Sequence, residues 1–179
     1  MSQSYTTDLD ILAHRAAARR DDFIVMQYLL ARMEPDLPDA ELDAIVEHIA
    51  APIVDAIDCT TCGNCCRSLH VYMMPADAER LAAGVDIPLD EVLDRYIDRE
   101  NAAKEGEWGR FKGPPCAFLQ GMLCTGYPHR PESCRLYPQF TPDFRCVLHQ
   151  MIDGASLCPI VYHVLIAMLD DTERLTRQE

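Results

Sequence analysis

The sequence lacks long apolar runs and is poor in basic residues. No stretch of its 179 residues approaches the roughly 20 apolar residues that a membrane-spanning helix needs. Sixteen Lys and Arg stand against 29 Asp and Glu, so the formal net charge is −13. Proteins that bind a phosphate backbone use basic side chains to displace its counterions. We therefore expect neither a membrane nor a nucleic acid among the partners.

The first ten residues also lack the basic segment and apolar core of a secretory leader, which predicts a cytoplasmic protein. In that reducing compartment, thiols serve more often as metal ligands or catalytic groups than as disulfide halves. The nine cysteines are an odd number, and the neighbours Cys65 and Cys66 cannot bridge each other without strain. The sequence does not predict a disulfide framework.

Charge is distributed unevenly along the chain. Residues 1–58 contain twelve acidic and four basic residues, a net of −8, whereas residues 108–146 contain two acidic and five basic ones, a net of +3. Chance variation of the surface would give the same asymmetry. A polythiolate site offers a second explanation, because thiolates form where cations compensate them.

Hydrophobic periodicity predicts helices over residues 8–33, 39–57 with a kink at Pro52, 75–83, 89–99 and 159–175. Short apolar segments at 69–73 and 144–148 predict strands, and 100–106 reads as a loop. Gln120 and Gly121 form a predicted hairpin turn between 116–119 and 122–124, and 130–138 is expected to make one helical turn. The fold class is thus mainly α with small irregular β-hairpins (α+β).

Two domains are expected. Residues 1–57 would form an N-terminal helical extension, which carries no evident chemistry and offers a surface for a protein partner or a homodimer. Residues 58–179 would form the cysteine-cluster domain, a metal-stapled core flanked by the N-terminal helices and the C-terminal helix.

The most informative motif is CxxCxxCC, formed by Cys59, Cys62, Cys65 and Cys66. A CxxC step lets two sulfurs converge on one metal, because the two intervening residues turn the backbone around it. Gly63 removes the steric cost of a left-handed turn in the second step. The motif therefore predicts a metal site.

The identity of the metal is open between two readings. Three thiolates at CxxCxxC match the run that wraps a [4Fe–4S] cluster, whose fourth ligand is often a remote Cys before proline, as in Cys158-Pro159. Four further sulfurs would equally fill a zinc tetrahedron, namely Cys66, Cys116, Cys124 and Cys134. We favour iron–sulfur over zinc alone, with a mixed or two-metal site also open.

Arginine and histidine residues near these cysteines are further candidates for the site. Arg67, Arg130 and Arg135 would hydrogen-bond sulfur or backbone near the metal or bind an anionic substrate. Histidine side chains that could complete the ligand shell are His129, His149 and His163. Cys146 lies in an apolar segment and is expected to be a small buried hydrophobe.

The cysteine-rich part resembles a known family, the zinc- or iron-chelating CxxCxxCC proteins, also called YkgJ-type cysteine cluster proteins. The resemblance runs from about Asp58 to Pro159 and implies eight metal-chelating cysteines. The matching segments are Cys59–Arg67, Pro115–Leu119, Cys124–Tyr127, Arg130–Pro138 and Cys158–Pro159. The implied ligands are Cys59, Cys62, Cys65, Cys66, Cys116, Cys124, Cys134 and Cys158, which leaves Cys146 as the extra cysteine.

Three functions follow from these observations. The first is a protein with an iron–sulfur centre in a redox, sensing or catalytic role, and the second is a zinc-stapled interaction module without catalysis. The third is thiol chemistry by Cys65 or Cys66. A related cluster occurs in flagellin lysine methylases, but this chain has no GxGxxG cofactor loop, and we assign no catalytic residue.

Overall fold

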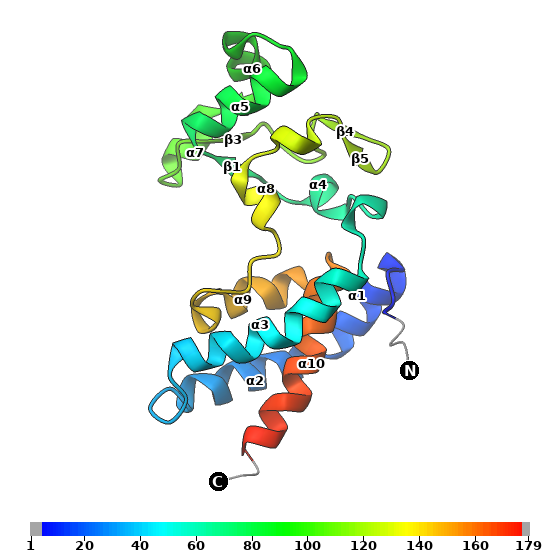
Figure 1. The fold of residues 1–179 in the computed structure, drawn as a ribbon, viewed down its shortest axis with the longest axis vertical. Helices are drawn as coiled ribbons and strands as arrows, with labels where there is room; N and C mark the ends of the chain where they lie inside the picture. The colour runs from blue at the N-terminus through cyan, green and yellow to red at the C-terminus, as the bar shows by residue number, and fades with distance from the viewer. Residues whose placement is uncertain (1–4, 177–179) are drawn as a thin grey trace. The chain divides into compact units, whose positions relative to one another are not determined.

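The computed structural model describes residues 5–176, and its many helices and few short antiparallel strand pairs confirm the predicted fold class. Two compact units are present (Figure 1). Residues up to Asp58 together with those from Pro138 onwards form one, here the helical unit, and Cys59–Tyr137 form the other, the cysteine unit. The chain first leaves the helical unit after Asp58. Residues from Pro138, however, pack with the N-terminal helices rather than with the cysteines.

The helical unit is built around its last helix. Its members are α1 (Leu9–Ala18), α2 (Arg20–Arg32), α3 (Asp39–Ala56), α9 (Phe144–Gly154) and α10 (Pro159–Thr176). Helix α10 contacts the other four (Figure 1). A helix that is apolar on most sides stabilises a fold best at its centre. Consistent with this, α10 buries Ile160, Val161, Val164, Leu165 and Met168.

Two predictions in this unit were wrong. The segment 8–33 is two helices rather than one, because Arg19 leaves helical geometry at φ −106° and ψ 4°. The predicted strand at 144–148 is the start of α9. Its buried residues recur at helical spacing, as Phe144, Leu148, Met151 and Ile152 show, so the period becomes visible only beyond residue 148.

Two charged residues, Asp43 and Arg145, connect α9 to the rest of the helical unit through hydrogen bonds and an ion pair. Asp43 on α3 accepts hydrogen bonds from the Asp143 and Phe144 N–H groups at 2.8 and 2.9 Å, and thereby caps α9. Arg145 donates to the carbonyls of Leu30 and Leu37 at 2.9 and 2.5 Å and pairs with the Asp39 carboxylate. Through these contacts Arg145 holds the loop after α2 against α9.

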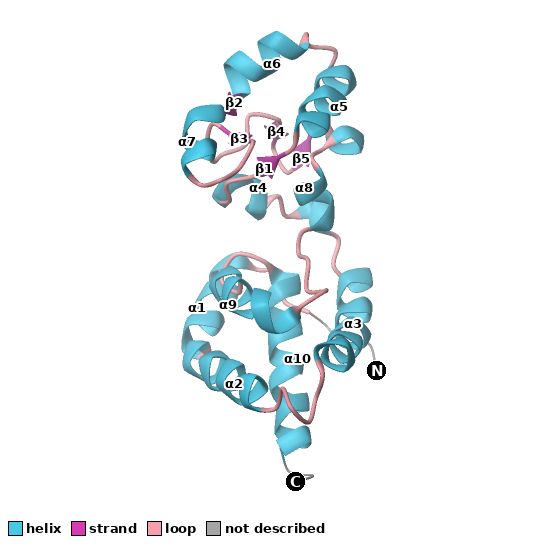
Figure 2. Ribbon diagram, turned by 90° about the vertical axis from the view of Figure 1, so that its left-hand side faces the viewer, coloured by secondary structure: helices cyan, strands magenta, loops and turns pink. Residues whose placement is uncertain are grey.

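The cysteine unit has a small antiparallel sheet in the order β1-β3-β2, formed by Tyr72–Met73, Gly109–Phe111 and Ile97–Asp98 (Figure 2). Around it lie the helices α5 (Pro75–Val85), α6 (Leu89–Tyr96) and α7 (Arg99–Lys104). Their shared core includes Met73, Leu81, Val92, Ile97, Phe111 and Phe118. The remaining elements are η1 (Cys59–Thr61), α4 (Asn64–Ser68), β4 (Leu119–Gln120), β5 (Leu123–Cys124), η2 (Tyr127–His129) and α8 (Glu132–Leu136).

Local predictions here were partly right. The hairpin exists, but its two-residue turn is Gly121-Met122, one position later than predicted. The expected loop at 100–106 begins with helix α7, because the Asp98 carboxylate accepts the Asn101 N–H at 2.9 Å and caps the helix. Strand β1 covers only the end of the predicted strand at 69–73.

Within residues 5–176, no helix is both long and apolar enough to cross a membrane.

Arg145→Lys should destabilise the helical unit by about 1–3 kcal/mol, because an ammonium cannot reach two carbonyls and a carboxylate in the geometry of the guanidinium. Far-UV circular dichroism during denaturant unfolding measures the change. The matched control is Arg174→Lys, since the Arg174 side chain is 74% exposed whereas that of Arg145 is 12% exposed. Equal unfolding midpoints for the two variants would contradict this role of Arg145.

Candidate metal centre

Seven of the nine cysteines lie in the cysteine unit, on four separate segments. Cys59 begins η1 and Cys62 follows it, while Cys65 and Cys66 are on α4. Cys116 precedes β4, Cys124 ends β5 and Cys134 is on α8. Cys59 is exposed and the other six are half-buried. The predicted left-handed turn at Gly63 is confirmed at φ +62°, immediately before α4.

Four thiols form one interacting group, called here the four-thiol group, which consists of Cys66, Cys116, Cys124 and Cys134. The Cys116 N–H donates to the Cys66 carbonyl at 2.7 Å and fixes the segment before β4 against α4. The Cys66 thiolate acts on the ionisation of the other three thiols, and Cys134 is also affected by Cys116 and Cys124. Residues separated by up to 68 positions therefore share one electrostatic environment.

Cys66 is the most acidic member of this group. A hydrogen bond with Cys65, whose sulfur lies 3.9 Å away, is the main cause, and it outweighs burial, which acts in the opposite direction. The charges of Arg130 and Arg67 lower the pKa further, to about 6. Burial raises the pKa of Cys116 to about 11 and that of Cys134 to about 12, and the Cys66 thiolate adds to both shifts. Burial also raises the pKa of Cys124.

Arg130 is a cation that acts electrostatically on this group. Its charge favours the thiolates of Cys66, Cys124 and Cys134. The guanidinium stacks on Tyr127, with its carbon 3.7 Å from the ring centroid, and its buried Nε has no hydrogen-bond partner among the described residues. An unsatisfied buried donor beside sulfur atoms fits a site that carries net negative charge when the thiols are deprotonated.

Arg67 connects the CxxCxxCC segment to the hairpin. It donates to the Cys62 carbonyl at 2.7 Å and to the Gly121 carbonyl at 2.8 Å. The hairpin also approaches Gly63 closely, because a Cβ at that position would lie 3.2 Å from the Met122 carbonyl oxygen. Arg67 thus binds the backbone of both segments.

Helix α5 holds the segment between Cys124 and Cys134. The Asp77 carboxylate is 5% exposed and accepts the Met74 N–H at 3.0 Å, the Glu132 N–H at 3.1 Å and a guanidinium N–H of Arg80. Arg80 also donates to the Arg130 carbonyl at 3.5 Å. Burial alone would raise the pKa of Asp77, but these hydrogen bonds hold it below its usual value.

Two glycines let α5 and the segment between Cys124 and Cys134 approach each other. A Cβ at Gly84 would lie 2.1 Å from His129 Cγ, and one at Gly126 would lie 2.9 Å from Leu81 Cδ1. Asp77, Leu81 and Gly84 recur at helical spacing, so they share one face of α5. This face aligns residues 126–132 and thereby positions Cys134 on α8. We did not predict this face from the sequence, although the spacing of Asp77 and Arg80 after Pro75 is visible there.

The remaining predicted residues are divided between the two units. Cys158 is buried in the helical unit just before α10, and Cys146 is exposed on α9, so the expectation that Cys146 is buried was wrong. His149 and His163 bind the carbonyls of Cys146 and Thr6 in the helical unit. Arg135 is exposed on α8, and the His129 ring packs against Gly84.

The donor chemistry of the cysteine unit fits a thiophilic metal. Cysteine sulfur is the preferred ligand of zinc, iron–sulfur clusters and other soft metals. As the side chains stand in residues 5–176, however, no three His, Cys, Asp or Glu residues converge closely enough to hold one ion. Binding would therefore require the thiols to turn towards a shared centre.

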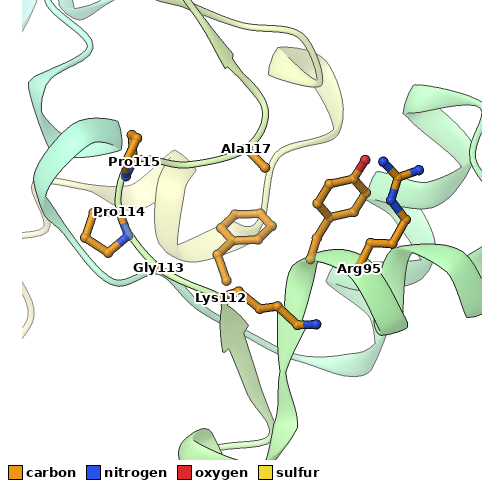
Figure 3. Close-up of a pocket in the computed structure, with 8 residues that line it drawn as sticks. Arg95, Lys112, Gly113, Pro114, Pro115 and Ala117 are labelled. Atoms are coloured by element: carbon orange, nitrogen blue, oxygen red, sulfur yellow. The ribbon is translucent and has the colours of Figure 1, made fainter.

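A small cleft lies beside Cys116. It has a volume of about 230 Å³ and is lined by Arg95, Tyr96, Phe111, Lys112, Gly113, Pro114, Pro115 and Ala117. Figure 3 shows Arg95 and the Lys112 amine towards one end and the two prolines towards the other. Arg95 pairs with Glu91, and Lys112 donates to the Asp94 carbonyl at 2.5 Å. Because both cations already have partners, we assign no anion site to this cleft.

Comparison with known proteins supports the reading of the cysteines. Residues 58–159, more than half of the chain, match the CxxCxxCC family model, which is described as a putative zinc- or iron-chelating domain. An uncharacterised protein of Methanocaldococcus jannaschii is 38% identical over 87 residues, which cover 46% of this chain and 44% of that protein. No solved structure matches the chain.

Asp77→Asn should lower the stability of the cysteine unit by about 2–3 kcal/mol, because an amide cannot accept from two N–H groups and a guanidinium as a carboxylate does. Fluorescence of Trp108, the single tryptophan, follows unfolding of this unit. Glu100→Gln is the control, since the Glu100 side chain is 85% exposed and its partner Lys104 is exposed as well. A wild-type unfolding midpoint for Asp77→Asn would show that α5 does not depend on this carboxylate.

Proposed function

This chain belongs to the CxxCxxCC family of zinc- or iron-chelating domains, and we propose that it is an iron–sulfur protein whose centre serves a redox, sensing or catalytic role. The observation that carries the proposal is that the CxxCxxCC segment and three downstream cysteines belong to one folded unit, in which the Cys116 N–H donates to the Cys66 carbonyl. A bound cluster would supply one-electron transfer or a Lewis-acidic iron. Within the chain, cysteines would hold it, and arginines would offset its charge.

The four-thiol group needs a cation in order to ionise fully. The Cys66 thiolate raises the pKa of Cys116, Cys124 and Cys134, and a bound metal cation would offset this repulsion and favour all four thiolates. Four thiolates on a dication still leave net negative charge, which Arg130 and Arg67 would compensate. We infer that Cys66, Cys116, Cys124 and Cys134 bind one metal centre.

The CxxCxxC triplet supports iron–sulfur as the chemistry. Cys59, Cys62 and Cys65 have the spacing of a [4Fe–4S] run, and Cys65 and Cys66 are neighbours on α4. Adjacent helical residues point about 100° apart, so the doubled cysteine can serve two groups of ligands. The family resemblance adds Cys158 as the eighth ligand, an assignment that stays a sequence-based prediction.

Zinc is the second candidate, and the four-thiol group itself favours it. Four cysteines with no open position make a closed tetrahedral site, which stabilises a fold without catalysis. In that case the protein would be an interaction module, and removal of the metal by a chelator would unfold the cysteine unit.

Anaerobic purification followed by a visible spectrum and a count of iron, sulfide and zinc per chain distinguishes the candidates. The proposal predicts a brown protein with inorganic sulfide and about four irons per cluster. A colourless protein that holds only zinc would refute the iron–sulfur assignment and leave the closed module.

Serine substitutions test the ligand assignment. Cys66→Ser and Cys124→Ser should each reduce bound metal substantially, because serine is a poor ligand for thiophilic metals. Cys146→Ser is the matched control and should keep wild-type metal content, because Cys146 is exposed on α9 in the other unit. Metal loss in Cys146→Ser, or none in Cys66→Ser, would overturn the assignment. Cys158→Ser tests the sequence-based eighth ligand in the same assay.

A further inference from the structure

Helix α2 is apolar on its outer face as well as on its inner face. The inner side chains Phe23, Met26 and Leu30 are buried in the helical unit, whose helices α1, α9 and α10 contact α2 (Figure 2). On the outside, Ile24, Val25 and Tyr28 are 47%, 56% and 60% exposed. Large apolar side chains grouped on the outside of a helix mark a surface that can bury against a partner.

Four outer residues form a single seam along α2. Asp21, Val25, Tyr28 and Arg32 are separated by four, three and four positions, the spacing at which side chains line one stripe of a helix pair. All four are exposed. The seam is apolar in the middle, acidic at its N-terminal end and basic at its C-terminal end.

We propose that two copies of this chain associate through α2, with the two helices antiparallel about a two-fold axis. In this register Asp21 of each copy faces Arg32 of the other, and Val25 faces Tyr28. Two-fold pairing requires a self-complementary surface, and this seam meets the requirement in the order of its charged and apolar residues. A parallel arrangement would instead place Asp21 against Asp21 and Arg32 against Arg32, which is repulsive.

Within one copy, Arg32 and Tyr28 contact each other, and both can instead contact the second copy. Arg32 donates to the Tyr28 hydroxyl at 3.0 Å, and its guanidinium carbon lies 5.7 Å from the Tyr28 ring centroid. Since both side chains are exposed, Arg32 can turn to Asp21 of the second copy while the Tyr28 ring covers Val25. One helix pair is smaller than a standard stable interface, so the dimer should be reversible, with a Kd of roughly micromolar or weaker.

Charge reversal tests this register directly. Sedimentation velocity of the purified, metal-loaded protein over a range of concentrations would give the dimer dissociation constant. Asp21→Arg and Arg32→Asp should each raise it by about tenfold or more, because each places two like-charged pairs across the seam. The double variant Asp21→Arg/Arg32→Asp should restore the wild-type value to within about threefold, since opposite charges face each other again.

Mixing the two single variants gives the sharpest outcome. One then carries two arginines on the seam and the other two aspartates, so the mixture should form a heterodimer tighter than either homodimer. Charges at the ends of α2 also change the stability of the helix through its dipole, but that effect acts within each chain. Helix stability alone therefore cannot explain association that is recovered on mixing.

Val25→Asp at the centre of the seam should also abolish association. The control is Val54→Asp on α3, because Val54 is 45% exposed but lies off the seam, and it should dimerise as the wild type does. Three results would each overturn the proposal: a wild-type protein that stays monomeric at all concentrations, single reversals without effect, or a mixture that fails to associate. Metal content should be unchanged throughout, so failure here leaves the metal assignment standing.

Discussion

A buried carboxylate organises the cysteine unit. Asp77 stands at the start of α5 and accepts hydrogen bonds from the backbone before the helix, from Arg80 on the helix, and from the backbone that opens α8. A buried charge is stable only when such partners surround it, so the carboxylate and its donors require one another. Because Cys134 lies on α8, the position of a thiol far along the chain depends on this one group. Arg67 acts in the same way between the CxxCxxCC segment and the hairpin.

Local chemistry made part of this structure predictable. Helix α3, the hairpin, the turn at Gly63 and the single turn at α8 all follow from short-range rules on periodicity, turn residues and proline. The family resemblance pointed to the cysteines for the same reason, since its motifs are contiguous. The sequence offered Cys66, Cys116, Cys124 and Cys134 as a possible zinc set, but spacing alone could not choose between this set and the CxxCxxC triplet with Cys158. That choice depends on how separate segments fold together.

Tertiary context explains the errors at residues 144–148, at Cys146 and at Asp77. The segment 144–148 is too short to distinguish a strand from a helix, and packing of Phe144 and Leu148 in the helical unit decides the matter. Cys146 then points outwards on α9, whereas an apolar neighbourhood suggested burial. Asp77 and Arg80 were overlooked because a helical acid and base usually form a solvated pair, and only the arrival of residues 130–132 gives them a structural role.

The order of the segments has a consequence for the entropy of the cysteine unit. Its residues are inserted between α3 and α9, so both of its ends belong to a single folded helical unit. While the helical unit stays folded, the unfolded states of residues 59–137 are restricted to closed loops. That restriction lowers the entropy of the unfolded segment much as a cross-link would, by an amount that grows only slowly with loop length. The folded helical unit can thus stabilise the fold of the cysteine unit through the connectivity of the chain alone.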